Sequence, residues 1–186
     1  MNRHQRMKLL ENQLRAYTDG TIEYINNQWI FFDAETEEAL LLDENLHQEI
    51  EVFRHNLWKK GILFEEGKVA FGDILLILKD QDKIRIRKHL VYSLERLFEE
   101  LLDDALVNFI TTLNSLGFSI YDCIYCYNHL NFVNHSQPSS GVNFIVFDNQ
   151  ELICTVQHHF TYFEKISDRF EFTLNSGKRL IVEKIS

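Results

Sequence analysis

KHLVYSLERLFEELLDDALVNFITTLNSL, residues 88–116, decides the fold, because it is the one long segment whose apolar residues recur at helical spacing. Gly117 follows, where a helix favours a residue with left-handed backbone. The pattern predicts one amphipathic helix that divides the chain into two β-rich parts. Its apolar face comprises Leu90, Leu94, Leu97, Phe98, Leu101, Leu102, Ala105, Leu106, Phe109, Ile110, Leu113 and Leu116.

The length of this helix raises a question of how it packs. A helix over residues 88–116 would be about 44 Å long, which exceeds the width of a four-stranded sheet. Either it breaks, with Asp103-Asp104 as the expected position because paired like charges favour a cap, or its overhang packs on the other lobe or on a second copy. In both cases the helix is the best candidate for an interface.

The part before the helix predicts a short amphipathic helix over residues 3–16 and then a series of short strands. Asn26-Asn27 and Glu66-Gly67 are typical of tight turns between strands. Strands at such close spacing predict a small, strongly bent sheet or barrel. We therefore expect residues 1–87 to form a β-barrel-like lobe of SH3-like size.

After Gly117 the strand pattern resumes and predicts an antiparallel sheet of about four strands. The loop 135–141 contains the only proline of the chain. The apolar face of this sheet requires a cover, and the helix at 88–116 has a stripe of suitable width. The expected fold class is α+β, with residues 88–186 forming a helix-plus-sheet lobe.

The charge of the chain is acidic and uneven. The net charge is −9, from 19 Lys and Arg against 28 Asp and Glu, which disfavours general nucleic-acid binding. Residues 32–51 contain eight acidic residues and no Lys or Arg, whereas residues 79–88 are mainly basic. These stretches are either two solvated faces or surfaces for electrostatic docking of a partner or a second copy.

The N-terminus lacks the apolar core of a secretory signal, and no stretch approaches 18 uninterrupted apolar residues. Three cysteines without an export signal indicate free thiols in a reducing compartment. We therefore expect a cytoplasmic protein that does not cross a membrane.

Cys123-Ile124-Tyr125-Cys126 has the C-x2-C spacing of metal knuckles and redox sites, and thiolates with imidazoles suit zinc. Ile-Tyr between the cysteines favours an extended strand over a tight turn. In a regular strand the two cysteines would face opposite sides, and one metal ion could not easily reach both. Ordinary buried cysteines are the competing interpretation. The complete set of candidate metal ligands is Cys123, Cys126, His129, His135, Cys154 and His158.

The histidines offer a second candidate site. His129 and His135 flank the loop, and they could meet His158 across a hairpin to bind a metal or act as a general base. Tandem His158-His159 on a strand would face opposite sides, so at most one of them joins a given site. The alternative is a set of surface histidines beside an aromatic sheet.

No complete catalytic set is evident in the sequence. It has no G-x-S-x-G elbow, no G-x-x-x-x-G-K-[ST] or G-x-G-x-x-G loop and no H-E-x-x-H helix, so it predicts no catalytic residue and no cofactor. The many aromatic residues after Gly117 either fill a core or line a pocket for a small apolar ligand.

The segments NRHQRMKLLENQLRAYTDGTIEYINNQWIFFD (2–33) and EIEVFRHNLWKKGILFEEGKVAF (49–71) resemble a family of small, uncharacterised soluble bacterial proteins of unknown function. The resemblance extends over the whole chain and implies a bacterial cytosolic protein. It carries no catalytic motif and assigns no activity.

The sequence therefore favours a non-enzymatic protein–protein interaction or regulatory module, including self-association into a homo-oligomer. The alternatives are a zinc- or thiol-dependent protein that uses Cys123, Cys126 and Cys154 with nearby histidines, or a small-ligand binder in the C-terminal lobe.

Overall fold

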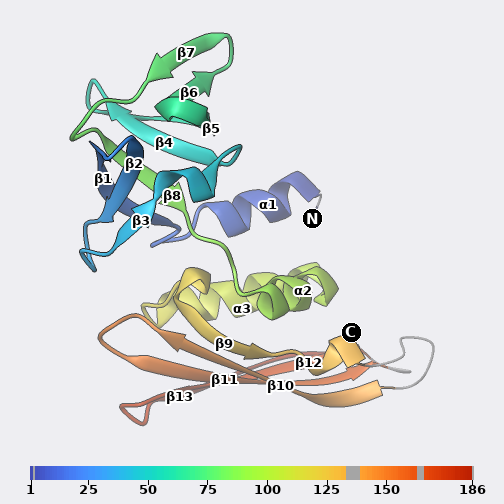
Figure 1. Ribbon diagram of the computed structural model, residues 1–186. Helices are drawn as coiled ribbons and strands as arrows, with labels where there is room; N and C mark the ends of the chain where they lie inside the picture. The colour runs from blue at the N-terminus through green and yellow to red at the C-terminus, as the bar shows by residue number, and fades with distance from the viewer. Residues whose placement is uncertain (2, 133–138, 163–165, 186) are drawn as a thin grey trace. The chain divides into compact units, whose positions relative to one another are not determined.

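The computed structural model describes residues 1, 3–132, 139–162 and 166–185, and the chain divides into two compact units (Figure 1). The β unit is Tyr17–Lys88, and the helical unit combines Met1–Ala16 with His89–Ser186. The observed boundary after Lys88 lies one residue from the expected boundary after residue 87. Residues 1–16, however, belong to the helical unit and not to the β unit. The fold class is α+β, and no helix of the described residues is long and apolar enough to cross a membrane.

The β unit contains one antiparallel eight-stranded sheet of order β3-β2-β1-β8-β4-β5-β6-β7. Its strands are β1 Tyr17–Ile25, β2 Gln28–Asp33, β3 Ala39–Leu41, β4 Glu49–Arg54, β5 Leu57–Phe64, β6 Lys68–Phe71, β7 Ile74–Ile77 and β8 Lys83–Arg87, with short 3-10 helices at Leu42–Asn45 and Glu65–Gly67. Phe31 of β2 and Val69 of β6 share one buried core, so the two halves of the sheet bend toward each other.

The expectation of a barrel is wrong in one respect, because the sheet of residues 17–88, all of which are described, does not close. Its two edge strands, β3 and β7, have three and four residues and do not pair with each other. Closure requires hydrogen bonding all round the sheet. β8 instead pairs with both β1 and β4 and occupies the centre.

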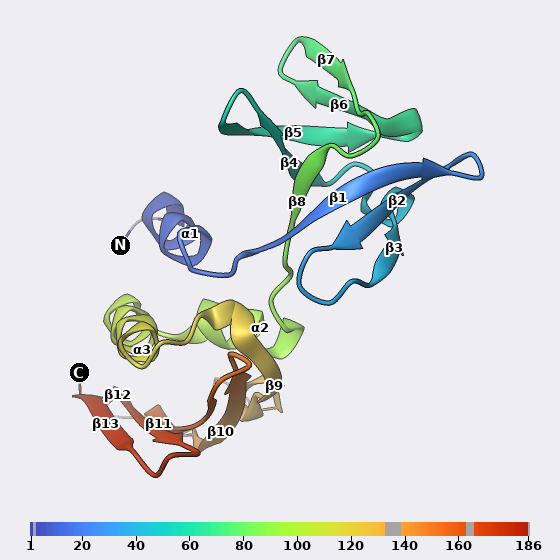
Figure 2. The ribbon, with the colours of Figure 1, turned by 90° about the vertical axis from the view of Figure 1, so that its left-hand side faces the viewer.

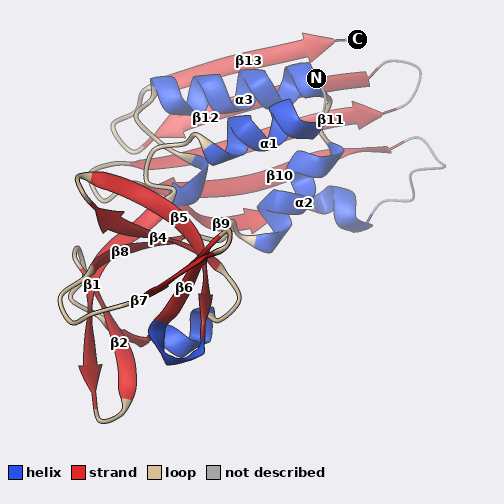
Figure 3. Ribbon diagram, turned by 90° about the horizontal axis from the view of Figure 1, so that it is seen from above, coloured by secondary structure: helices blue, strands red, loops and turns tan. Residues whose placement is uncertain are grey.

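The described residues of the helical unit form five antiparallel strands, one more than the four or so expected, in the order β13-β12-β11-β10-β9 (Figure 3). They are β9 Cys123–Tyr127, β10 Ser139–Asp148, β11 Ile153–Tyr162, β12 Ile166–Leu174 and β13 Arg179–Ile185. Short 3-10 helices at Ile120–Asp122 and His129–Phe132 flank β9.

The predicted single helix is two helices, α2 Tyr92–Glu100 and α3 Asp103–Ser115. Leu101 and Leu102 between them have extended backbone, with ψ of 142° and 150°. The break therefore precedes the expected Asp103-Asp104 pair, which lies in the first turn of α3. Carboxylates are favourable there because the N-terminus of a helix carries partial positive charge.

The helices and the sheet form layers, in which α2 and α3 lie between the sheet and α1, Arg3–Glu11 (Figures 1 and 2). Phe109 of α3 is the centre of the core between α2, α3 and the sheet. Its ring centroid lies 5.4 Å from that of Phe98, 6.2 Å from Phe147, 5.2 Å from Phe170 and 5.5 Å from Phe172. The helical stripe and the apolar face of the sheet thus cover each other, as the sequence predicts.

Arg6 of α1 binds the break between α2 and α3. Its guanidinium donates to the carbonyl oxygens of Phe98 and of Leu101, the latter at 2.9 Å, and to Asp103 Oδ1 at 2.6 Å. The amino group of Met1 pairs with the same carboxylate at 2.5 Å. The last carbonyls of a helix have no hydrogen-bond donor within that helix, and Arg6 of α1 supplies a donor for them. The helical segment that we expected to form an interface therefore contacts α1.

We predict that Arg6→Ala lowers the free energy of unfolding by about 1–3 kcal/mol, because it removes the donor to the carbonyl groups of Phe98 and Leu101 and one of the two cationic partners of Asp103. Urea denaturation of the full chain measures this change. Lys8→Ala, an exposed change on the same helix, is the control and should stay within about 0.5 kcal/mol of the parent. Equal effects of the two substitutions would contradict the role of Arg6.

Candidate functional site

The structure places Cys123 and Cys126 on the same side of β9, contrary to the expectation of opposite sides. The register between β9 and β10 shifts between Val146 and Phe147, so that Cys123 lies opposite Phe147 and Cys126 opposite Ile145. Such a β-bulge reverses the alternation of side chains locally. Both cysteines consequently pack against the core beneath the sheet.

The three cysteines are free thiols in apolar surroundings. Burial raises the pKa of Cys123 to about 12 and the pKa values of Cys126 and Cys154 to about 11. A thiol must lose its proton to act as a nucleophile or a metal ligand. These three are protonated at neutral pH and behave as small apolar side chains.

The candidate histidines do not join the cysteines in one site. His129 lies beside the Phe160 ring, with centroids 6.1 Å apart, while His158 is buried and His159 is on the other side of β11. His135 lies outside the described residues. Among the described residues, no group of three or more His, Cys, Asp or Glu is arranged to hold a metal ion.

His158 instead belongs to a buried hydrogen-bonded network that connects β10, β11 and β12. Asn143 Nδ2 donates to His158 Nδ1 at 3.0 Å, and His158 Nε2 donates to Asp168 Oδ1 at 2.8 Å. Tyr162 donates its hydroxyl to the same Asp168 oxygen at 2.7 Å, and Asn143 Oδ1 accepts the backbone N–H of His129 at 2.7 Å. We assign the proton of the neutral His158 ring to Nε2, because Nε2 faces a carboxylate acceptor and Nδ1 faces an amide donor.

Each polar side chain of this network has a partner, so burying them does not leave an uncompensated group. Burial lowers the pKa of His158 despite the opposing effect of Asp168. The ring therefore stays neutral and holds three strands in register. This arrangement fits a structural role better than general-base catalysis.

The lowered pKa of His158 predicts that the protein becomes less stable as the pH decreases. The unfolded histidine, with a pKa near 6.5, takes up a proton that the folded ring resists, so stability is lost as pH falls below about 6.5. The slope contributed by this group is at most about 1.4 kcal/mol per pH unit. Urea denaturation between pH 7.5 and 5.5 should show a smaller slope for His158→Gln than for the parent, and an unchanged slope would contradict the assignment.

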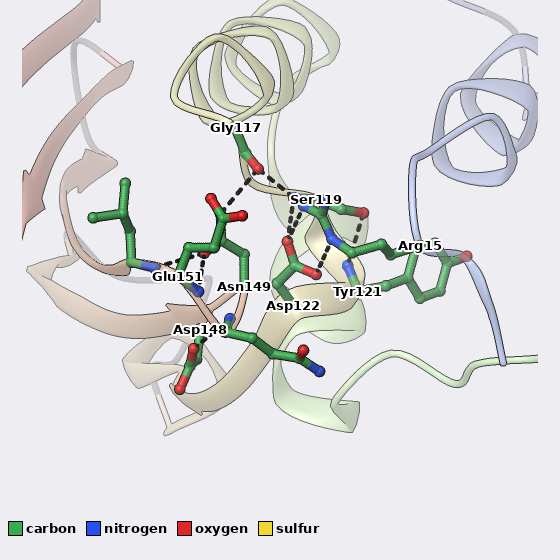
Figure 4. A network of polar contacts seen from close by, with 10 residues as sticks. Arg15, Gly117, Ser119, Tyr121, Asp122, Asp148, Asn149 and Glu151 are labelled. Carbon is green, nitrogen blue, oxygen red and sulfur yellow. Dashed lines mark hydrogen bonds and ion pairs between the residues drawn. The ribbon is translucent and has the colours of Figure 1, made fainter. Parts of the chain in front are cut away.

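A second polar network connects the end of the N-terminal segment to the rest of the helical unit (Figure 4). Arg15 Nε donates to Asp122 Oδ1 at 2.7 Å, and its Nη2 donates to Asp122 Oδ2 at 2.5 Å and to the carbonyl of Gly117 at 2.9 Å. Asn149 Nδ2 donates to that carbonyl at 3.2 Å. The segment before β1, the turn after α3 and the β10–β11 turn thus share one junction.

Asp122 is the buried centre of this junction. Its Oδ2 also accepts the backbone N–H of Ser119 at 2.7 Å, while the Ser119 hydroxyl accepts the N–H of Tyr121 at 3.2 Å. This reciprocal pattern is a capping box for the short helix Ile120–Asp122. A bidentate arginine–carboxylate pair is a strong and directional contact, so the junction is a structural clamp.

We predict that Asp122→Ala lowers the free energy of unfolding by about 2–4 kcal/mol, because it removes the carboxylate that pairs with Arg15 and that accepts the Ser119 N–H. Asp122→Asn, which keeps an acceptor oxygen, should cost less. Glu151→Gln removes a carboxylate from the neighbouring turn, where the side chain is exposed, and should change stability by under about 0.5 kcal/mol. Thermal and urea unfolding of the three variants provide the comparison.

A group of exposed aromatic side chains, the aromatic face, consists of Tyr125, Tyr127 and Phe144, which strand alternation places on the side of the five-stranded sheet that faces away from α2 and α3, and of Phe132 from the 3-10 helix that follows β9. Tyr127 of β9 lies opposite Phe144 of β10, and Phe132 is 75% exposed and stacks on Tyr127 with centroids 6.2 Å apart. Exposed apolar side chains are common singly, but a contiguous set marks an interaction surface.

The other edge of the same side of the sheet is charged. Glu171 accepts from Arg169 at 2.6 Å and from Arg179 at 2.5 Å, and His159 Nε2 lies 3.6 Å from it. The two arginines lower the pKa of Glu171 against the opposing effect of desolvation, which is the largest single influence. Charge and apolar surface are therefore segregated across one sheet.

Sequence reasoning identified the aromatic residues of this region but not the group of four. Strand alternation places Tyr125, Tyr127 and Phe144 on one side only if β9 is recognised as the neighbour of β10. That pairing connects strands separated by residues 128–138, and no local pattern specifies it.

Comparisons with known proteins identify relatives without an assigned activity. A family model described as "Protein of unknown function (DUF2777)" matches residues 4–184. The uncharacterized protein YisN of Bacillus subtilis (strain 168) is 31% identical over 179 residues, which cover 96% of this chain and 91% of that protein. No solved structure matches the chain.

Proposed function

The chain belongs to the DUF2777 family of proteins of unknown function, and we propose that it is a non-enzymatic protein–protein interaction module that self-associates through the aromatic face. The observation that carries this proposal is the exposure, within the described residues, of Tyr125, Tyr127 and Phe144 on one side of the five-stranded sheet and of Phe132, which stacks on Tyr127. Tyr and Phe are enriched in the cores of protein interfaces because they bury large areas at little conformational cost.

The contrast between the two edge strands supports an interaction at β9. Proteins protect edge strands with charged residues, proline or bulges. β13 contains Arg179 and Glu183, whereas β9 has the sequence CIYCY, with no charge and no proline. Of these devices β9 has only the bulge between Cys123 and Tyr125, so it is the less charged of the two edges, and it borders the aromatic face.

The lack of charge in the aromatic face is compatible with a second copy as the partner. The net charge of −9 opposes the association of two copies, so a contact between them is least unfavourable where the contact surface itself adds no like charges. None of the four residues of the aromatic face is charged. An isologous contact places this patch against itself, so that aromatic side chains meet aromatic side chains and no buried charge lacks a partner.

We predict that the parent protein dimerises reversibly and that Phe132→Ser combined with Phe144→Ser weakens the dimer at least tenfold, because truncating aromatic anchors removes most of the apolar contact. Sedimentation velocity across a micromolar concentration series measures the dissociation constant. Both positions are exposed, so the variant should fold.

Ile181→Ser is the matched control, since Ile181 is 53% exposed on the same side of the sheet at the opposite edge. It should leave the dissociation constant within about twofold of the parent. A parent protein that stays monomeric at high micromolar concentration rules out self-association, and equal loss in the control rules out the aromatic face as its site.

A further inference from the structure

The β unit contains a cavity of about 530 Å³ that is distinct from the surface proposed for self-association. It is bordered by the end of the β1–β2 hairpin, the two short 3-10 helices and the turn before β8. A volume of this size is within the range of small-ligand sites. Its lining residues are Tyr24, Asn27, Gln28, Trp29, Asp43, Glu65, Glu66 and Asp80.

The hairpin places two aromatic rings at this cavity. Asn26 and Asn27 have φ values of +51° and +64°, as the two central residues of a type I′ turn require. The turn sets Tyr24 directly opposite Trp29, and their ring centroids lie 5.0 Å apart at an interplanar angle of 51°. The rings therefore present their surfaces together at one end of the sheet.

Gly67 fixes the position of the indole. A Cβ atom on Gly67 would lie 2.4 Å from Trp29 Nε1, and the φ of Gly67 is +66°. Both facts exclude a larger residue, because the contact is too close and the backbone is left-handed. Trp29 consequently packs against the 3-10 helix that carries Glu65 and Glu66, so aromatic and acidic groups are held side by side.

The four carboxylates of the cavity are incompletely neutralised. Glu66 pairs with Lys68 at 2.5 Å, and Asp80 Oδ1 accepts the backbone N–H of Tyr24 at 2.7 Å. Within residues 17–88, all of which are described, no ion pair is found for Asp43, Glu65 or Asp80. The cavity thus has an excess of negative charge that a ligand can match.

The arrangement does not suit a metal ion. The four carboxylates surround a wide cavity, and among the described residues no group of three or more His, Cys, Asp or Glu could hold a metal. The aromatic rings add a different kind of attraction, because the face of Trp or Tyr carries negative potential that stabilises an adjacent cation. The rings of Tyr24 and Trp29 beside carboxylates are therefore suited to an organic cation.

We propose that this cavity binds an alkylammonium group, supplied either by the lysine side chain of a peptide or by a free polyamine. The Tyr24 and Trp29 rings contact the alkyl chain and the cation, and the carboxylates of Asp43 and Glu65 provide the opposite charge. The proposed interaction is recognition of the cation by charge and by aromatic surface.

The experiment follows Trp29 fluorescence in the full chain with Trp58→Phe, which removes the other tryptophan. The probes are putrescine, a lysine-containing peptide whose lysine is replaced by norleucine in a control peptide, and CaCl₂. We expect saturable quenching by putrescine or by the lysine peptide, with no quenching by the norleucine peptide. The tighter of the two ammonium probes identifies the source of the ligand.

Asp43→Asn with Glu65→Gln should weaken ammonium binding at least tenfold, because the substitutions keep the shape and remove two charges. Glu37→Gln with Glu38→Gln, which removes two exposed charges from the turn between β2 and β3, is the control and should change affinity by less than about twofold. The proposal is overturned if neither ammonium probe quenches saturably, if only Ca²⁺ does, or if both double variants weaken binding equally.

Discussion

The side of the five-stranded sheet that carries Phe147, Phe170 and Phe172 has to be covered by an apolar surface, and the helical unit is organised around this constraint. Phe109 of α3 meets all three rings, and Phe98 of α2 meets Phe109. Each such ring contributes about 1.5–3 kcal/mol when it leaves water. The break between α2 and α3 allows both helices to direct their aromatic residues to this one cluster, and α1 then satisfies the carbonyl groups that the break exposes.

The apolar spacing of residues 88–116 was sufficient to predict which side chains cover the sheet, but not that the helix is interrupted. Leu97, Leu101 and Ala105 are buried as predicted, whereas Leu102 is 43% exposed. The extended backbone at Leu101 and Leu102 ends one helix and begins another in the structure. In the sequence, however, apolar residues continue at helical spacing through this position, so the break leaves no mark on the pattern. The sequence therefore shows the stripe without showing the interruption.

The chemistry of the candidate site depended on pairing between distant strands, and sequence reasoning was weaker there. Strand alternation assigned His158 and His159 to opposite sides of β11, in agreement with the structure. The same rule failed for Cys123 and Cys126, because a bulge against β10 is a property of two strands and not of one. The partners of His158 are likewise on neighbouring strands, and no spacing within one segment reveals them.

The two proposed surfaces differ in the force that each one uses, and this difference makes them separable. The aromatic face is uncharged, so added salt screens the repulsion between two acidic copies without weakening the apolar contact. The cavity beside Trp29 attracts its ligand through carboxylates such as Glu65, and the same salt screens that attraction. Under the two proposals, added salt therefore strengthens the contact between two copies at the aromatic face and weakens the binding of a cation in the acidic cavity, so the response to salt distinguishes the two interactions.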